Sequence, residues 1–246
     1  MRVGGKLQWL HRSADAVASN ADYTHLFVHP KRGQDALLSG QSIFGDCVKW
    51  TRSAGAVHDC WASYFDAGKG RHALCGAHLL RELAALVEQG SVWAKAMHSY
   101  LLEAYKASRY GPILAPEVVY WRDYYEQLCG QADEQELPPM VFFKANGQTG
   151  RANRSKGRNL LDRLILHQDA VLAFAFWPGV PFTNNQAERD LRPAKVKQRV
   201  SGCFRTEKGA GMYARISGFV STMRKQSRNV VDELANILSG SFQWAT

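Results

Sequence analysis

The segment Thr183-Asn-Asn-Gln-Ala-Glu-Arg-Asp-Leu-Arg192 places one carboxylate, Glu188, within a run of basic residues. From Thr183 to Arg228 there are eleven Lys and Arg against three acids, a local charge of +8 in a chain whose net charge is +9. A carboxylate can hold a divalent cation while neighbouring basic side chains hold phosphates, so this pattern is typical of metal-dependent phosphoryl transfer on a polyanion. The basic residues nearest to Glu188 are Arg189, Arg192, Lys195, Lys197 and Arg199.

A simpler interpretation of Glu188 is an ion pair with Arg192, one helical turn further along. Thr183 and Gln186 have the spacing of a capping box, which predicts that a helix begins here. Because such pairs are common on helix surfaces, the local sequence alone favours the ion pair over a metal site.

A second candidate carboxylate, Asp59, stands at the end of a strand of small residues predicted over 54–59, and Glu188 follows 129 residues later. One acid at a strand end and one on a helix suit a ribonuclease H-like core, in which three carboxylates hold two divalent ions. Hard oxygen ligands select Mg²⁺ or Mn²⁺. Since the chain has 22 Asp and Glu residues, spacing alone does not single out this pair.

Other residues that could bind metal are His72, Cys75 and His78. We do not interpret them as a zinc site, because a strand-to-helix crossing would not aim all three at one centre and no second Cys or His pair completes a tetrahedron. For His58, beside Asp59, two interpretations stay open: tuning of metal or substrate contact, and a structural hydrogen bond. The five cysteines are odd in number and scattered, which predicts reduced thiols.

The composition fits one large domain or a domain with a sizeable insertion, since the chain has 246 residues and is 46% hydrophobic. The pI of about 9.4 favours nucleic acid as the partner over a membrane surface. No apolar run approaches the roughly 20 residues that a membrane-spanning helix needs, and the first residues lack the apolar stretch of a signal peptide. We therefore expect a cytoplasmic protein without a membrane partner.

The hydrophobic pattern predicts strands first and helices afterwards. Strands are expected at 6–11 and 23–29, joined as a hairpin, and at 54–59 and 71–78, with a short helix at 31–38 between the two pairs. A helical middle follows over 79–177, interrupted by polar loops at 130–139 and 146–158. Pro193 is expected to end or kink the helix that carries Glu188. A Gly-rich connection at 200–211 and two more helices complete the chain, the last over 230–238.

Five ordered blocks together resemble transposases of insertion-sequence family 66, and they cover nearly the whole chain. This resemblance outweighs the local preference for an ion pair at Glu188. The blocks are Val28-His-Pro-Lys-Arg-Gly-Gln-Asp-Ala-Leu37, Val57-His-Asp-Cys-Trp-Ala-Ser-Tyr-Phe65, His72-Ala-Leu-Cys-Gly-Ala-His-Leu-Leu-Arg-Glu-Leu83, Asn184-Asn-Gln-Ala-Glu-Arg189 and Gly202-Cys-Phe-Arg-Thr-Glu-Lys-Gly-Ala210.

The resemblance implies an α/β fold: a ribonuclease H-like core with a large helical insertion and a helical C-terminus. The expected parts are 1–78 and 178–246 for the core and 79–177 for the insertion. Asp59 matches the family's second catalytic Asp, and Glu188 matches its catalytic Glu. Both would bind Mg²⁺ or Mn²⁺, in a two-ion site expected only in the intact family member. DNA phosphates would be held by Arg189, Arg192, Lys195, Lys197 and Arg199.

The family's first catalytic Asp lies in an Asp-Glu-Thr segment just before a stretch that resembles Val3-Gly-Gly-Lys-Leu-Gln-Trp-Leu-His11. Because the chain begins inside that block, we expect this Asp and the family's N-terminal DNA-binding and zinc-ribbon regions to be missing, as in a truncated copy or one with a misplaced start codon. Residues 39–52 also depart from the family pattern. Asp15, Asp22 and Asp46 could substitute for the first Asp, but none matches the motif.

The expected function is therefore that of the catalytic-domain portion of a DDE-type transposase, which cleaves DNA strands and joins them to a target. The expected partners are element ends, target DNA, and a second copy or a full-length transposase. As given, the chain is expected to be inactive without the first Asp. The main alternative is a non-catalytic DNA-binding remnant that pairs with full-length transposase. A further alternative is a ribonuclease H-like nuclease that cleaves without joining strands.

Overall fold

The computed structural model describes residues 14–29, 55–67, 71–138, 154–201 and 204–244. Over these residues the chain is a mixed α/β protein that is mostly helical, with two small sheets. It divides into two compact units, with one boundary after Ala62, the first residue of α3 (Ala62–Ala67), and another between Asn184 and Asn185. None of the helices in the described ranges is long and apolar enough to cross a membrane. The mixed α/β class is confirmed, and the ribonuclease H-like core and the three sequence-based parts stay predictions.

The first unit is built around a hairpin in which β1 (Ala14–Ser19) pairs antiparallel with β2 (Thr24–His29). The side chain of Asn20 forms the turn, since its Oδ1 accepts the backbone N–H groups of Asp22 at 2.9 Å and Tyr23 at 2.7 Å. The strand expected at 23–29 is confirmed. Its partner is β1 rather than the expected strand at 6–11, which lies outside the described residues.

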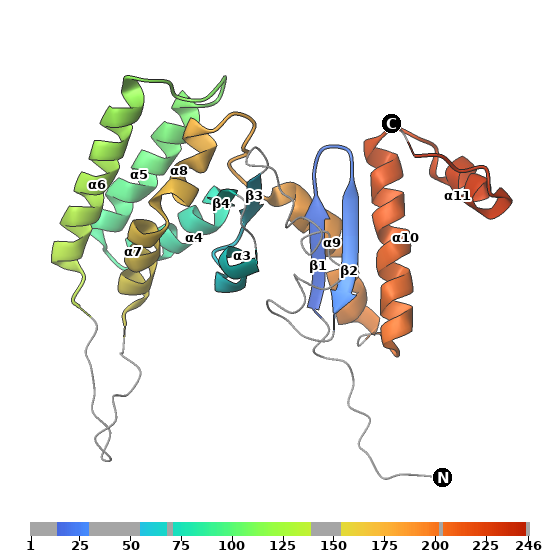
Figure 1. Ribbon diagram of the computed structural model, residues 1–246. Coiled ribbons are helices and arrows are strands. Elements are labelled where there is room, and N and C mark those ends of the chain that lie inside the picture. Colours follow the sequence, from blue (N-terminus) through green and yellow to red (C-terminus); the bar gives the residue numbers. More distant parts are fainter. Residues whose placement is uncertain (1–13, 30–54, 68–70, 139–153, 202–203, 245–246) are drawn as a thin grey trace, which may run out of the picture. The chain divides into compact units, whose positions relative to one another are not determined.

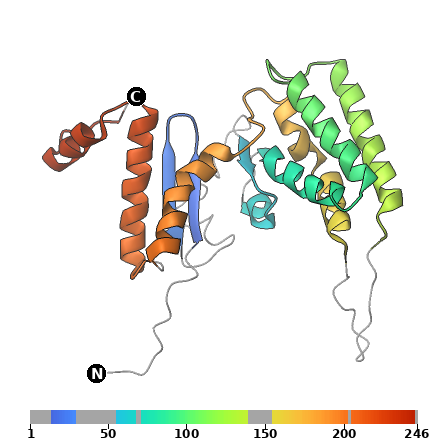
Figure 2. The ribbon, with the colours of Figure 1, turned by 180° about the vertical axis from the view of Figure 1, so that it is seen from behind.

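The described helices of this unit are α3, apart from Ala62, and α9 (Asn185–Ser201), α10 (Glu207–Lys225) and α11 (Val230–Ser239). Helix α9 packs against β1 and α10 against β2 (Figures 1 and 2). Gly218 permits the close approach of α10, because a Cβ there would lie 3.1 Å from the carbonyl oxygen of Thr24. The core beneath these helices consists of Leu26, Val28, Phe204, Ala210 and Ala214.

Helix α9 departs from the sequence-based expectation at two points. It begins at Asn185, so the residue at the cap position is Asn184 rather than Thr183. It also continues through Pro193 to Ser201, so Pro193 does not end it. Proline lacks the N–H that would bond to the backbone carbonyl four residues earlier in the helix. Because Pro193 is exposed, water can bond to that carbonyl instead.

The second unit contains a parallel pair of strands, β3 (Gly55–His58) and β4 (Arg71–Leu74), followed by five helices. Helix α8 packs against β4, and α4 to α7 pack on one another, which confirms the helical middle (Figure 1). The fully buried side chains include Leu83, Met97, Leu101, Leu161 and Leu172. The helices are α4 (Gly76–Val87), α5 (Val92–Ala107), α6 (Glu117–Gln135), α7 (Lys156–Leu166) and α8 (Gln168–Phe176).

The polar loop expected at 130–139 is wrong in its first half, because α6 continues to Gln135. Its polar residues bind the neighbouring helices instead of forming a turn. Glu136 accepts hydrogen bonds from Trp93 Nε1 at 3.0 Å and Ser155 Oγ at 2.7 Å. Arg158 forms an ion pair with Asp133 at 2.5 Å. These tertiary contacts are not visible in a local pattern.

Gly76, the first residue of α4, is the tightest contact between α4 and the segment before α9. Its N–H donates to the carbonyl of Phe182 at 2.8 Å, and a Cβ at this position would lie 2.1 Å from the Phe182 ring. That ring cannot swing away freely, because it stacks on Tyr105 at 4.4 Å and meets Phe174 edge-on at 4.7 Å. The first turn of α4 is therefore fixed against this aromatic cluster.

Gly76→Ala should destabilise the second unit by about 1–3 kcal/mol, the usual effect of overpacking a close-packed site. The matched control is Gly130→Ala in α6, where a Cβ would meet nothing within 4 Å. That change should be neutral or stabilising by about 0.5–1 kcal/mol, because Ala favours helix over Gly. Urea unfolding of the two variants measures the difference, and equal stabilities would contradict the described packing.

Candidate active site

Asp59 lies directly after β3, at the carboxyl end of the parallel strand pair. Its backbone is fixed by a tight turn, since its carbonyl accepts the N–H of Trp61 at 2.7 Å and lies 2.5 Å from His58 Nδ1. The neighbouring His58 carbonyl accepts the N–H of Cys75 at 3.0 Å. These bonds extend the strand pairing to its last residue and fix the backbone from which the Asp59 side chain projects.

The Asp59 carboxylate lines a cavity of about 300 Å³ within the second unit. Its Oδ1 atom is buried and has no hydrogen-bond partner among the described residues. A buried carboxylate oxygen without a partner is energetically costly, so this atom is suited to an incoming cation or donor. The cavity wall also includes Cys60, Trp61, Cys75, His78, Glu82 and Arg163.

The histidine beside Asp59 makes a structural hydrogen bond. His58 Nε2 lies 3.0 Å from His72 Nδ1, across the β3–β4 pair. Burial lowers the pKa of His58 to about 4, although its hydrogen bond to the Asp59 carbonyl acts to raise it. At neutral pH this ring is therefore uncharged and adds no positive charge beside Asp59.

Arg163 on α7 and Glu82 on α4 also line this cavity. Arg163 Nη1 donates to Glu82 Oε1 at 3.1 Å, and its Nη2 contacts Glu82 Oε2, so the pair is bidentate. Burial raises the pKa of the neighbouring Cys60 thiol, against the opposing effect of the Arg163 charge. Cys60 is therefore a neutral thiol at neutral pH, not a thiolate nucleophile.

The second predicted carboxylate, Glu188, lies in the first turn of α9 and is half-buried. The inner stripe of this helix consists of Ala187, Leu191 and Ala194, at helical spacing, with Ala194 fully covered. The outer surface carries all five predicted phosphate-binding residues, which are exposed: Arg189, Arg192, Lys195, Lys197 and Arg199. The helix therefore presents its cations to solvent.

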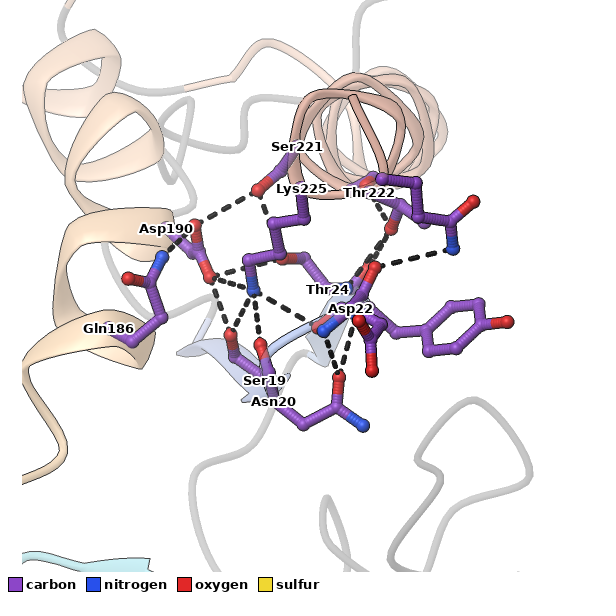
Figure 3. A network of polar contacts seen from close by, with 12 residues as sticks. Ser19, Asn20, Asp22, Thr24, Gln186, Asp190, Ser221, Thr222 and Lys225 are labelled. Carbon is purple, nitrogen blue, oxygen red and sulfur yellow. Dashed lines mark hydrogen bonds and ion pairs between the residues drawn. The ribbon is translucent and has the colours of Figure 1, made fainter. Parts of the chain in front are cut away.

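Asp190, two residues after Glu188, fixes α9 to the rest of the first unit (Figure 3). Its Oδ2 accepts hydrogen bonds from Ser19 at 2.5 Å and Thr24 at 3.0 Å, and forms an ion pair with Lys225 at 2.8 Å. Its Oδ1 accepts from Ser221 at 2.9 Å. One carboxylate thus joins α9 to both strands of the hairpin and to α10.

This network is both buried and charged. The side chains of Asp190 and Lys225 are only 8% and 11% exposed. Burial acts to raise the pKa of Asp190, but hydrogen bonds from Lys225 and three hydroxyl groups outweigh it and hold the pKa below its usual value. Lys225 also donates to the carbonyls of Asn20 at 2.8 Å and Tyr23 at 3.1 Å. Both charges are satisfied, as a buried ion pair requires.

Sequence reasoning missed this network because it counted Asp190 and Lys225 as surface charges of the basic segment. A second cation of that segment, Arg228, also binds within the unit, through an ion pair with Glu233 at 2.8 Å. Lys197 is exposed, but its Nζ lies over the rings of Phe204 and Tyr213 at 6.0 and 5.8 Å. The residues next to Asp190 in the sequence do not indicate that it binds Ser19, Thr24 and Lys225, which lie far from it along the chain.

Asp59 and Glu188 lie in different units, so their approach to each other stays a prediction. In the described ranges, no group of three His, Cys, Asp or Glu residues could hold a metal ion. Of the substitutes considered for the first Asp, Asp22 is exposed in the hairpin turn, and Asp15 belongs to β1 opposite Val28. Asp46 lies outside the described residues.

A family model described as Transposase IS66 family matches residues 2–212. The chain belongs to that family. The matched residues of this IS66-family chain contain both Asp59 and Glu188, all five exposed cations of α9 and the whole helical middle. Helix α11 lies beyond the match. Searches of curated proteins and of solved structures gave no match.

Proposed function

We propose that this IS66-family chain is the catalytic-domain portion of a DDE-type DNA transposase with a ribonuclease H-like core, and that Asp59 and Glu188 are two of its three catalytic carboxylates. Family membership supports transposition as the process. In the intact family member, the third carboxylate would be the Asp of an Asp-Glu-Thr segment. Helices α4 to α8, which lie in the chain between Asp59 and the helix that carries Glu188, would be the insertion into this core.

The observation that carries this proposal is the Asp59 carboxylate, which ends a strand and leaves Oδ1 buried without a partner in a cavity. An oxygen so placed fits a divalent metal ion, because Mg²⁺ and Mn²⁺ prefer carboxylate oxygens. Asp59 and Glu188 would hold the two ions, which supply Lewis-acid stabilisation at the scissile phosphate when bound. Neighbouring His58 is neutral and does not compete as a cation.

DNA is the proposed partner of the outer surface of α9. Five exposed cations on one helix form a positive surface with no acid on its outer side except the half-buried Glu188. Lys and Arg in such an arrangement bind the phosphate backbone without reading sequence. The α9 cations would then bind backbone phosphates on either side of the phosphodiester bond to be cut.

Replacing Arg192, Lys195 and Lys197 by Ala should weaken binding to a DNA duplex and flatten its salt dependence. The slope of log affinity against log salt should become shallower by about 0.9 for each phosphate that the variant no longer binds. Fluorescence anisotropy between about 50 and 200 mM salt measures both quantities.

The matched control replaces Lys95, Lys106 and Arg109, three exposed cations of the second unit, by Ala. It removes the same net charge from a surface to which we assign no DNA binding. The α9 variant should lose more affinity than this control. Equal losses would show that overall charge, rather than α9, attracts DNA.

A further inference from the structure

A second cavity of about 440 Å³ adjoins the one at Asp59, between α4 and α7 of the second unit. Among the described residues, Glu82 and Arg163 are the two that line both cavities. The bidentate pair therefore stands between the carboxylate at Asp59 and a neighbouring hollow. The second cavity is also lined by the polar or basic residues Arg81, Gln89, Lys156 and Asn159 and by the apolar residues Ala85, Leu86 and Leu160.

The guanidinium of Arg163 is held in an orientation suited to an anion with two oxygens. Its Nε donates to the carbonyl of Asn159, one turn earlier in α7, at 3.2 Å. The two remaining nitrogens point together at the carboxylate of Glu82. A planar guanidinium fork binds a carboxylate and a phosphodiester in the same bidentate way, so Glu82 occupies a position that a phosphate could take.

We propose that Arg163 binds a backbone phosphate of the DNA strand held at Asp59, and that Glu82 takes the place of this phosphate when DNA is absent. The inference rests on the proposed function and adds a phosphate-binding residue contributed by the helical insertion. Arg81 and Lys156 line the same second cavity and would extend the positive path for the strand.

The exchange of Glu82 for a phosphate is energetically reasonable. The Glu82 side chain is 44% exposed, so it can return to water without leaving a buried unpaired charge. The Arg163 side chain is 29% exposed and keeps its Asn159 hydrogen bond throughout. Arg163 therefore stays oriented while its anion changes, which lowers the entropic cost of binding.

The test measures the affinity of the full chain for a fluorescein-labelled DNA duplex by anisotropy, without added metal. Arg163→Gln should weaken binding by about tenfold and reduce the salt slope by about one, as expected when one phosphate is no longer held. Glu82→Gln should tighten binding by about threefold or more, because it removes the anion that competes for the fork. The gain should vanish when Glu82→Gln is combined with Arg163→Gln.

If Arg163 and Glu82 only tie α7 to α4, both single variants remove the same ion pair. Glu82→Gln should then tighten DNA binding no more than the loss of one negative charge elsewhere on the surface does. Glu88→Gln, at the end of α4, controls for the change in net charge and should have a smaller effect than Glu82→Gln. Arg163→Lys, which keeps the charge but not the fork, should fall between wild type and Arg163→Gln, and it replaces Arg163→Gln if that variant does not fold.

An affinity that is unchanged or weaker in Glu82→Gln overturns the inference. If wild type still binds DNA with a salt dependence that the α9 triple variant flattens, the proposed function stands without the Arg163 subsite. If wild type shows no salt-dependent binding to DNA, both the inference and the proposed function fail.

Discussion

Asp190→Ala should lower the free energy of unfolding of the first unit by about 3–5 kcal/mol, the cost of removing one partner from a buried ion pair. The variant would leave Lys225 buried beside the hairpin without its counter-charge, and would remove the acceptor for Ser19, Thr24 and Ser221 (Figure 3). Amide hydrogen exchange in β1 and β2 measures this loss locally, since the two units need not unfold together.

The matched control for this prediction is Asp169→Ala. Asp169 also forms an ion pair at 2.8 Å, with Arg122, but the two side chains are 71% and 36% exposed. An exposed pair contributes about 0–1 kcal/mol, so the control should be nearly neutral. Combining Asp190→Ala with Lys225→Met should recover part of the loss, because no unpaired charge then remains buried. Equal effects of Asp190→Ala and Asp169→Ala would refute the buried network.

Glu188→Gln and Asp59→Asn should each reduce metal-dependent DNA cleavage by about a thousandfold or more. Metal ions contribute several kcal/mol of transition-state stabilisation, and each 1.36 kcal/mol corresponds to about tenfold in rate. The assay uses a polypeptide in which the family's Asp-Glu-Thr segment precedes residue 1, so that all three proposed carboxylates are present. Cleavage of labelled element-end DNA in Mg²⁺ and in Mn²⁺ gives the rates.

Asp22→Asn is the control in the same polypeptide, because Asp22 is an exposed acid in the β1–β2 turn. It should cleave at the wild-type rate. Because Asn and Gln nearly preserve the shape of the acids they replace, thermal melting should show that all three variants fold. Full activity in Glu188→Gln would remove Glu188 from the proposed site, and a large loss in Asp22→Asn would make Asp22 a candidate ligand.

Local chemistry predicted much of the fold. The alternation at 23–29 and the small residues before Asp59 gave correct strands, and the apolar periodicity gave the helical middle. Errors occurred where distant contacts decide the outcome. Polar residues near 133–136 continue α6 because Arg158 and Trp93 bind them. The expected hairpin partner of β2 was wrong, because β2 pairs with β1 across a turn that the Asn20 side chain forms.

The candidate site was predictable only in part. Residue type, position and a family resemblance led to Asp59 and Glu188, whose joint role stays a prediction. The basic segment noted in the sequence does carry exposed cations on α9. The roles of Asp190 and Arg163 were not predictable, since each depends on partners far away in the sequence. Asp190 binds Thr24, 166 residues earlier, and Arg163 binds Glu82, 81 residues earlier. Such pairings are determined by the packed fold rather than by local spacing.

The proposed function requires that the Asp59 and Glu188 carboxylates converge on one pair of divalent ions. A crystal structure of the chain grown with DNA and Mn²⁺ tests this most directly, because anomalous scattering locates the metal. We expect both carboxylates to face one site, close enough to share ions that lie roughly 3.5–4 Å apart, with a Mn²⁺ peak beside Asp59 Oδ1. Side chains of Asp59 and Glu188 on separate faces, with no metal between them, would contradict the claim.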